Sequence, residues 1–173
     1  MNYPILSTLI FLPLISSFFI FLSKEQNNNS AIYISLFSSL ATFILSLFVW
    51  YSLDLSSSDF QFLEEKSWIN NFIKFKLGVD GISILFIVLT TFITPICIIS
   101  CINSVKVRVK EFLIAILVLE TFMIGVFCSL DLVVFYLFFE AGLIPMFLII
   151  GVWGGPKRVY SAFKFFLFTL LGS

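Results

Sequence analysis

Residues 131–156, DLVVFYLFFEAGLIPMFLIIGVWGGP, decide the fold class of this chain. About twenty apolar residues lie between Asp131 and Gly154, which is long enough to cross a bilayer. Glu140 lies near the middle of this stretch. Placing a carboxylate at the bilayer centre costs about 2.5–3.5 kcal/mol, so such a group usually has a partner, lines a water-filled cavity or carries a proton. Pro145 withholds a backbone N–H from the carbonyl of Ala141 and predicts a kink. An acid beside a loosened helical turn is therefore the main functional signal.

The composition of the whole chain agrees with a membrane protein. Of 173 residues 60% are hydrophobic and 12% are charged, and the mean hydropathy is +1.12. A soluble domain carries about 25% charged residues. A net charge of +0 gives no bulk attraction to nucleic acid, and the absence of histidine removes the commonest metal ligand. We interpret the three cysteines as small buried hydrophobes, and expect no cofactor or metal site in this chain.

Hydropathy predicts an all-α integral membrane protein with about six transmembrane helices. The predicted division is residues 1–110, three helices with a polar loop at 54–79, and residues 111–173, three more helices. The last apolar run has no polar flank after it, so we expect the chain to be cut from, or split out of, a longer protein. The predicted spans are residues 3–22, 31–53, 80–102, 111–130, 132–152 and 157–173.

The polar stretch at 54–79 has three interpretations. Its apolar residues alternate with polar ones, and Asn70-Asn71 can turn the chain, so it fits a short hairpin. It also fits a segment lying at the membrane interface, or a solvated connector.

Two local signals shape the third predicted span. Asp80 is placed to accept backbone N–H bonds at the helix start. Pro95 predicts a kink, and we expect the hydroxyls of Thr91 and Thr94 to help satisfy the carbonyl that it frees.

The basic residues predict an orientation. With six spans, the first, third and fifth loops share one side, and the positive-inside rule places that side in the cytoplasm or matrix. The N-terminus is then expected on the opposite side. The basic residues in these loops are Lys24, Lys106, Arg108, Lys110, Lys157 and Arg158.

Two acids lie inside predicted spans, Glu120 and Glu140. A short connection makes their helices antiparallel neighbours, and each acid lies about ten residues from that turn, so both lie at similar depth. They either face each other or point apart. Tyr136, one turn before Glu140, is placed to hydrogen-bond it. Lys164 either snorkels to the interface or reaches toward Glu140. Glu140 is a proton-carrying group, or a protonated acid bonded within the bundle.

These residues carry a resemblance. The strings FYLFFEAGLIPMFLIIGVWGG, GVDGIS and KFFLFTLLGS resemble the antiporter-like subunits of respiratory complex I, the proton-pumping NADH:ubiquinone oxidoreductase, a family that includes chain 4 and bacterial subunit M. The resemblance implies fourteen transmembrane helices, of which this chain would hold helices one to six. Glu140 and Pro145 match the family's helix-five glutamate and proline. Their partner, a lysine on helix seven, lies outside this sequence.

The resemblance also implies a function. The chain would help couple NADH oxidation and quinone reduction to proton translocation, as a subunit without a redox centre or NADH site. Flavin, iron–sulfur centres and quinone are expected in other subunits. Expected partners are membrane-arm subunits, lipids and a separate chain carrying the remaining helices. The alternatives are a non-conducting structural subunit, or a subunit of a cation/proton antiporter or membrane-bound hydrogenase.

The source is expected to be organellar. A sequence rich in Phe, Asn and Ser suggests an AT-rich organellar genome, and therefore the mitochondrial inner membrane. A bacterial plasma membrane is the alternative.

Overall fold

The computed structural model describes residues 4–23, 28–54, 59–69 and 73–173, which form six helices and one two-stranded sheet. Five of the helices are long and apolar enough to cross a membrane. The sixth, with 15 residues, is shorter. The helices are α1 (Ile5–Leu22), α2 (Asn28–Tyr51), α3 (Ser83–Ser104), α4 (Val109–Cys128), α5 (Leu132–Trp153) and α6 (Arg158–Gly172).

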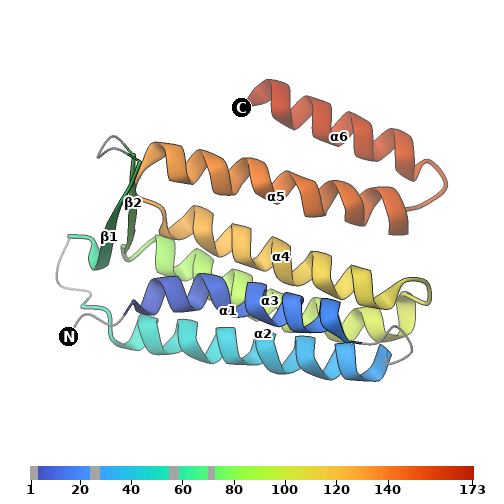
Figure 1. Ribbon diagram of the computed structural model, residues 1–173, viewed down its shortest axis with the longest axis horizontal. Helices are drawn as coiled ribbons and strands as arrows, with labels where there is room; N and C mark the ends of the chain where they lie inside the picture. Colours follow the sequence, from blue (N-terminus) through green and yellow to red (C-terminus); the bar gives the residue numbers. More distant parts are fainter. Residues whose placement is uncertain (1–3, 24–27, 55–58, 70–72) are drawn as a thin grey trace.

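The helices lie side by side, with α4 at the centre (Figure 1). Helices α1, α2 and α3 cover one side of α4, while α5 packs on the other side and α6 on the far side of α5. The end of α1, the start of α2 and the α3–α4 and α5–α6 connections all lie at one end of the bundle, called here the loop end (Figure 1). The predicted basic residues of the third and fifth loops therefore share one end, while Lys24 lies outside the described residues.

The polar stretch at 54–79 contains a hairpin. Strand β1 (Gln61–Ile69) pairs antiparallel with β2 (Ile73–Val79). Leu77 and Val79 are buried, and Leu77 also forms an isolated bridge with Ser129 at the end of α4. The hairpin interpretation is thus confirmed, and the all-α description needs this small sheet added. The predicted turn at Asn70-Asn71 lies outside the described residues.

The hairpin also caps the first helix. The Glu64 carboxylate on β1 accepts hydrogen bonds from the backbone N–H of Leu6, at 2.7 Å, and of Ser7, at 3.1 Å. The Ser7 hydroxyl donates to the same carboxylate. The first backbone N–H groups of a helix have no partner within it, so Glu64 satisfies two of them and complements the positive end of the helix dipole.

Acidic side chains begin two further helices. The Asp80 carboxylate accepts the backbone N–H of Ser83 at 2.7 Å, as predicted, and the Asp80 N–H donates to the Ser83 hydroxyl at 2.9 Å. Asp131 accepts the N–H of Val133 at 2.9 Å and of Val134 at 3.3 Å. Both arrangements replace lost helical hydrogen bonds at the membrane boundary.

The expectation for the hydroxyls near Pro95 was wrong in detail. Pro95 frees the carbonyl of Thr91, four residues earlier. The Thr94 hydroxyl donates instead to the carbonyl of Thr90 at 3.0 Å, and the Thr91 hydroxyl to that of Ile87 at 3.0 Å. Each hydroxyl therefore bonds back along its own helical turn, as serine and threonine commonly do.

Two apolar clusters occupy opposite ends of the bundle. The hairpin-end cluster joins the start of α1 to the hairpin and the end of α4, and comprises Leu6, Leu9, Ile10, Val49, Leu53, Leu77, Val79, Ile84, Ile87, Ile124 and Cys128. The loop-end cluster comprises Ile20, Ala31, Ile98, Phe112, Leu113, Ile116 and Leu117. Buried polar residues of α2, α3 and α4 lie between them along these helices.

Candidate functional site

Glu140 lies near the middle of α5 and is half-buried. Its Oε1 accepts a hydrogen bond from the Ser173 hydroxyl at 2.7 Å. Helix α6 runs back along α5 from the loop end, which brings its last residue to the depth of Glu140 (Figure 1). The carboxylate therefore faces α6.

Tyr136 does not support Glu140 as predicted. Although it lies one turn earlier, its side chain is 47% exposed, and no hydrogen bond joins the two side chains in the described part of the chain. The half-buried carboxylate instead binds the end of α6. One-turn spacing brings side chains to the same face but does not fix their rotamers.

Glu120 is buried and points another way. It is 2% exposed, and its Oε1 lies 2.8 Å from the Thr42 hydroxyl of α2. Since Glu140 faces α6 and Glu120 faces α2, the open question is settled: the two acids point apart. They form two sites at opposite sides of the α4–α5 pair.

Lys164 is exposed on α6. Among the described residues, no hydrogen bond or ion pair joins it to Glu140. Of the two sequence-based interpretations, an outward-reaching lysine fits this exposure.

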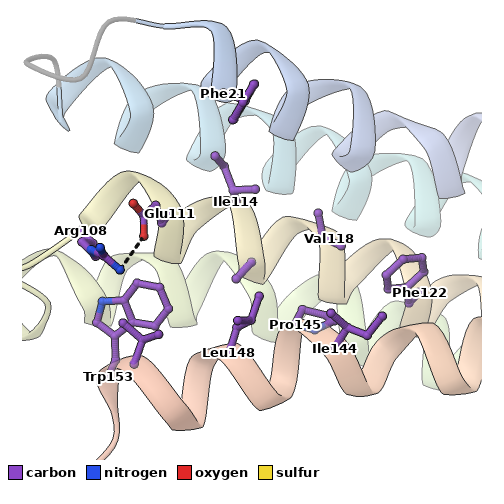
Figure 2. A pocket seen from close by; sticks show the side chains of 12 residues that line it. Phe21, Arg108, Glu111, Ile114, Val118, Phe122, Ile144, Pro145, Leu148 and Trp153 are labelled. Carbon is purple, nitrogen blue, oxygen red and sulfur yellow. Dashed lines mark ion pairs between the residues drawn. The ribbon is translucent and has the colours of Figure 1, made fainter.

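Pro145 lines a groove between α4 and α5, and Phe21 of α1 also lines it (Figure 2). The cavity has a volume of about 530 Å³ and is almost entirely apolar. Arg108 and Glu111 form an ion pair of 3.6 Å at its loop-end mouth. Neither Glu120 nor Glu140 lines it. The groove is therefore separate from both acids.

Sequence reasoning missed two partners of the acids. Thr42 belongs to a row of hydroxyl residues on α2 at spacings of three and four, a pattern visible in the sequence. Ser173 contacts Glu140 only because α6 folds back on α5. No local sequence pattern signals that contact.

The Glu140 carboxyl has one hydrogen-bond donor in the described part of the chain. A half-buried carboxyl with one hydroxyl donor keeps its second oxygen available for a further partner or a proton. Placing an acid at such depth in a membrane costs free energy, so acids found there usually have a function or a full set of hydrogen-bond partners.

Comparisons with known proteins agree with this arrangement. A family model described as "NADH:quinone oxidoreductase/Mrp antiporter, TM" matches residues 129–173, a range that contains Glu140 and Pro145. Over 177 residues the chain is 46% identical to NADH-quinone oxidoreductase subunit M of Rickettsia prowazekii (strain Madrid E), covering 100% of this chain and 36% of that protein. NADH-ubiquinone oxidoreductase chain 4 of Marchantia polymorpha is 48% identical over 173 residues, covering 99% and 35%.

A solved structure has the same fold. A chain of respiratory complex I from Thermus thermophilus with bound NADH matches with a TM-score of 0.79 and 25% sequence identity. The match covers 96% of this chain and 33% of that one. The chain thus spans about a third of the length of the relatives that it matches.

Proposed function

The chain corresponds along its whole length to the N-terminal part of an antiporter-like membrane subunit, the family of subunit M and chain 4 of NADH:quinone oxidoreductase, and we propose that Glu140 is its proton-carrying group. The observation that carries the proposal is the half-buried Glu140 carboxyl in the middle of a membrane helix, with one hydroxyl partner at the end of α6. Acidic side chains inside membrane helices, with an oxygen free to take a further partner, often belong to proton pathways.

The proposed role is charge switching. Glu140 holds a proton when its surroundings are neutral and releases it when a cation approaches, since a nearby positive charge stabilises the carboxylate. By resemblance that cation is a lysine on a later helix of the family. Electron transfer takes place in other subunits, and this chain contributes to coupling it with proton movement.

The proposed partners follow from the same similarity. Membrane-arm subunits of complex I would surround the chain, together with sequence corresponding to the other two thirds of the relatives, on whichever polypeptide carries it. The mitochondrial inner membrane is the proposed location, by similarity to the Marchantia protein, and a bacterial plasma membrane is the alternative, by similarity to the Rickettsia protein.

The test replaces Glu140 by glutamine in the assembled complex. Glu140→Gln keeps the shape and the hydrogen bond from Ser173 but cannot exchange a proton. We expect proton pumping and quinone-linked NADH oxidation to fall at least several-fold while assembly is retained. The matched control is Glu111→Gln, an exposed acid at the groove mouth, which should leave both activities unchanged. Normal pumping by an assembled Glu140→Gln complex would refute the proposal.

A second candidate is a subunit of a cation/proton antiporter, because the matching family model covers both classes. The same charge switch would then be driven by a cation gradient. Purification of the native complex separates the two. NADH-oxidising flavoprotein subunits accompany the chain under the first proposal and are missing under the second.

A further inference from the structure

The face that α2 turns toward the bundle is polar. Helix α2 exposes large apolar side chains such as Phe37, Ile44 and Phe48 on its outer face. In a membrane this arrangement leaves the apolar side for lipid and places hydroxyls inside. The buried hydroxyl row comprises Ser35, Ser38, Ser39, Thr42 and Ser46.

Most of these hydroxyls bond back to their own helix. Ser35, Ser39 and Ser46 each donate to the carbonyl three residues earlier, at 2.8–3.1 Å, and the Thr42 hydroxyl lies 2.9 Å from the Ser39 carbonyl. Ser38 is the exception: it is 3% exposed, and its Oγ has no partner in the described part of the chain. It lies one turn before Thr42, on the same face.

Glu120 reaches this row from α4. Its Oε1 pairs with Thr42, whereas its Oε2 is buried and has no partner among the described residues. Two polar atoms are therefore buried without a partner among the described residues, Glu120 Oε2 and the Oγ of Ser38, which lies one turn before Thr42. Buried groups of this kind are normally satisfied by protein or by an internal water molecule.

Counting hydrogens assigns the proton. The Thr42 hydroxyl has one hydrogen but lies within bonding distance of two oxygens, the Ser39 carbonyl at 2.9 Å and Glu120 Oε1 at 2.8 Å. Ser35, Ser39 and Ser46 of the same row donate to backbone carbonyls. If Thr42 does the same, its oxygen must accept, and the hydrogen between it and Glu120 must belong to a protonated carboxyl.

The surroundings of Glu120 favour the same assignment. In the described ranges no lysine or arginine is ion-paired with it, and its carboxyl has no hydrogen-bond partner besides Thr42. The row continues through the Ser46–Thr91 contact of 2.7 Å to α3. Along the helices, this polar layer lies between the hairpin-end and loop-end clusters, which close both ends with apolar side chains.

We propose that Glu120, Thr42 and Ser38 form a second proton-binding site, in which the neutral Glu120 carboxyl donates to Thr42 and a water molecule bridges Glu120 Oε2 and Ser38 Oγ. The site faces α2 and is independent of Glu140, which faces α6. A purely structural hydroxyl row, which only lets helices pack closely, is the competing explanation.

Infrared spectroscopy of the full chain in lipid bilayers tests the proposal. Because a protonated Glu140 would give a band of its own, the measurement is made in Glu140→Gln. We expect a carboxylic-acid C=O band at neutral pH in this variant, and we expect it to disappear when Glu120→Gln is added. The band should shift on transfer from H₂O to D₂O, because a bound proton exchanges with solvent. Its absence from Glu140→Gln, its persistence in the double variant, or its failure to shift in D₂O would each overturn the proposal.

Two milder variants give an independent reading. Thr42→Val keeps the side-chain volume but removes the acceptor, so the band should move to higher frequency and remain present. Ser38→Ala should shift the band as well, since it removes one anchor of the bridging water. An unchanged band in both variants, at unchanged helix content by circular dichroism, would contradict the assigned partners. Because none of these readouts measures pumping, failure here is distinguishable from failure of the Glu140 proposal.

Discussion

At the scale of single residues, carboxylates at helix starts hold the hairpin end of the bundle together. Glu64 is the most consequential, since it caps α1 from a strand 57 residues away in sequence. Asp80 and Asp131 act within their own turns. A cap that also joins two elements contributes to tertiary structure as well as to helix stability.

Replacing Glu64 by alanine should therefore destabilise the chain. The variant leaves two N–H groups of α1 without their acceptor, and the loss of such a cap costs about 0.5–2 kcal/mol. Chemical unfolding in detergent micelles measures the change. Glu64→Gln is the matched control, because its amide oxygen still accepts a hydrogen bond, and it should lose less. Equal stability of Glu64→Ala and wild type would contradict the capping role.

Asp80 predicts a pH dependence of stability. Its bonds with the Ser83 hydroxyl and backbone N–H lower the pKa of the Asp80 carboxyl from the usual value of 3.8. A lowered pKa stabilises the folded state at pH values above 3.8, and this contribution is lost as the pH falls through the lowered pKa. Thermal unfolding at neutral and acidic pH should show a smaller acid-induced loss in Asp80→Asn than in wild type. An identical loss in both would exclude Asp80 as a source.

At the scale of helices, the close approach of α4 and α5 depends on a missing side chain. A Cβ added at Gly125 would lie 2.6 Å from the Phe138 ring, too close for any real contact. At Gly142, on the other helix of the pair, the nearest atom is 3.7 Å away, an ordinary contact. The same substitution should thus have opposite effects at the two positions.

We expect Gly125→Ala to destabilise the chain by about 1–3 kcal/mol, because the Phe138 ring must move within a packed interface. Gly142→Ala should be neutral or stabilising by up to about 1 kcal/mol, since alanine favours helix more than glycine does. Thermal unfolding of both variants in detergent measures the difference. Destabilisation of equal size at both sites would show that helix geometry, and not the Phe138 contact, sets the cost.

At the scale of the whole molecule, hydropathy predicted the spans because crossing a bilayer requires about twenty apolar residues. The composition of each segment alone shows whether it meets this requirement. The rotation of each helix about its axis depends instead on all its neighbours. The sequence therefore placed Glu120 and Glu140 at similar depth but left their directions open. The Glu64 cap and the Ser173 contact arise from chain reversals, and neither has a local pattern that reveals it.

The arrangement of the loops predicts the orientation of the bundle in the membrane. The α3–α4 and α5–α6 connections share the loop end with the end of α1, and Arg108, Lys110 and Lys157 lie there. The hairpin lies at the other end (Figure 1). Lys110 donates through its Nζ to the carbonyl of Phe21 at 3.0 Å and to that of Ser23, so the basic loop is fixed to the end of α1. The positive-inside rule places this end in the cytoplasm or matrix.

Single cysteines at Lys157 and Asp59, in a background where Cys97, Cys101 and Cys128 are alanine, test that orientation in sealed vesicles. A membrane-impermeant maleimide should label Lys157→Cys only in inside-out vesicles and Asp59→Cys only in right-side-out vesicles. The physical reason is that translocating three basic loops is disfavoured, whereas the polar stretch 54–80 at the hairpin end holds more acids than lysines. The reverse labelling pattern would invert the orientation. Labelling of both positions from one side would contradict the membrane-spanning arrangement of the bundle itself.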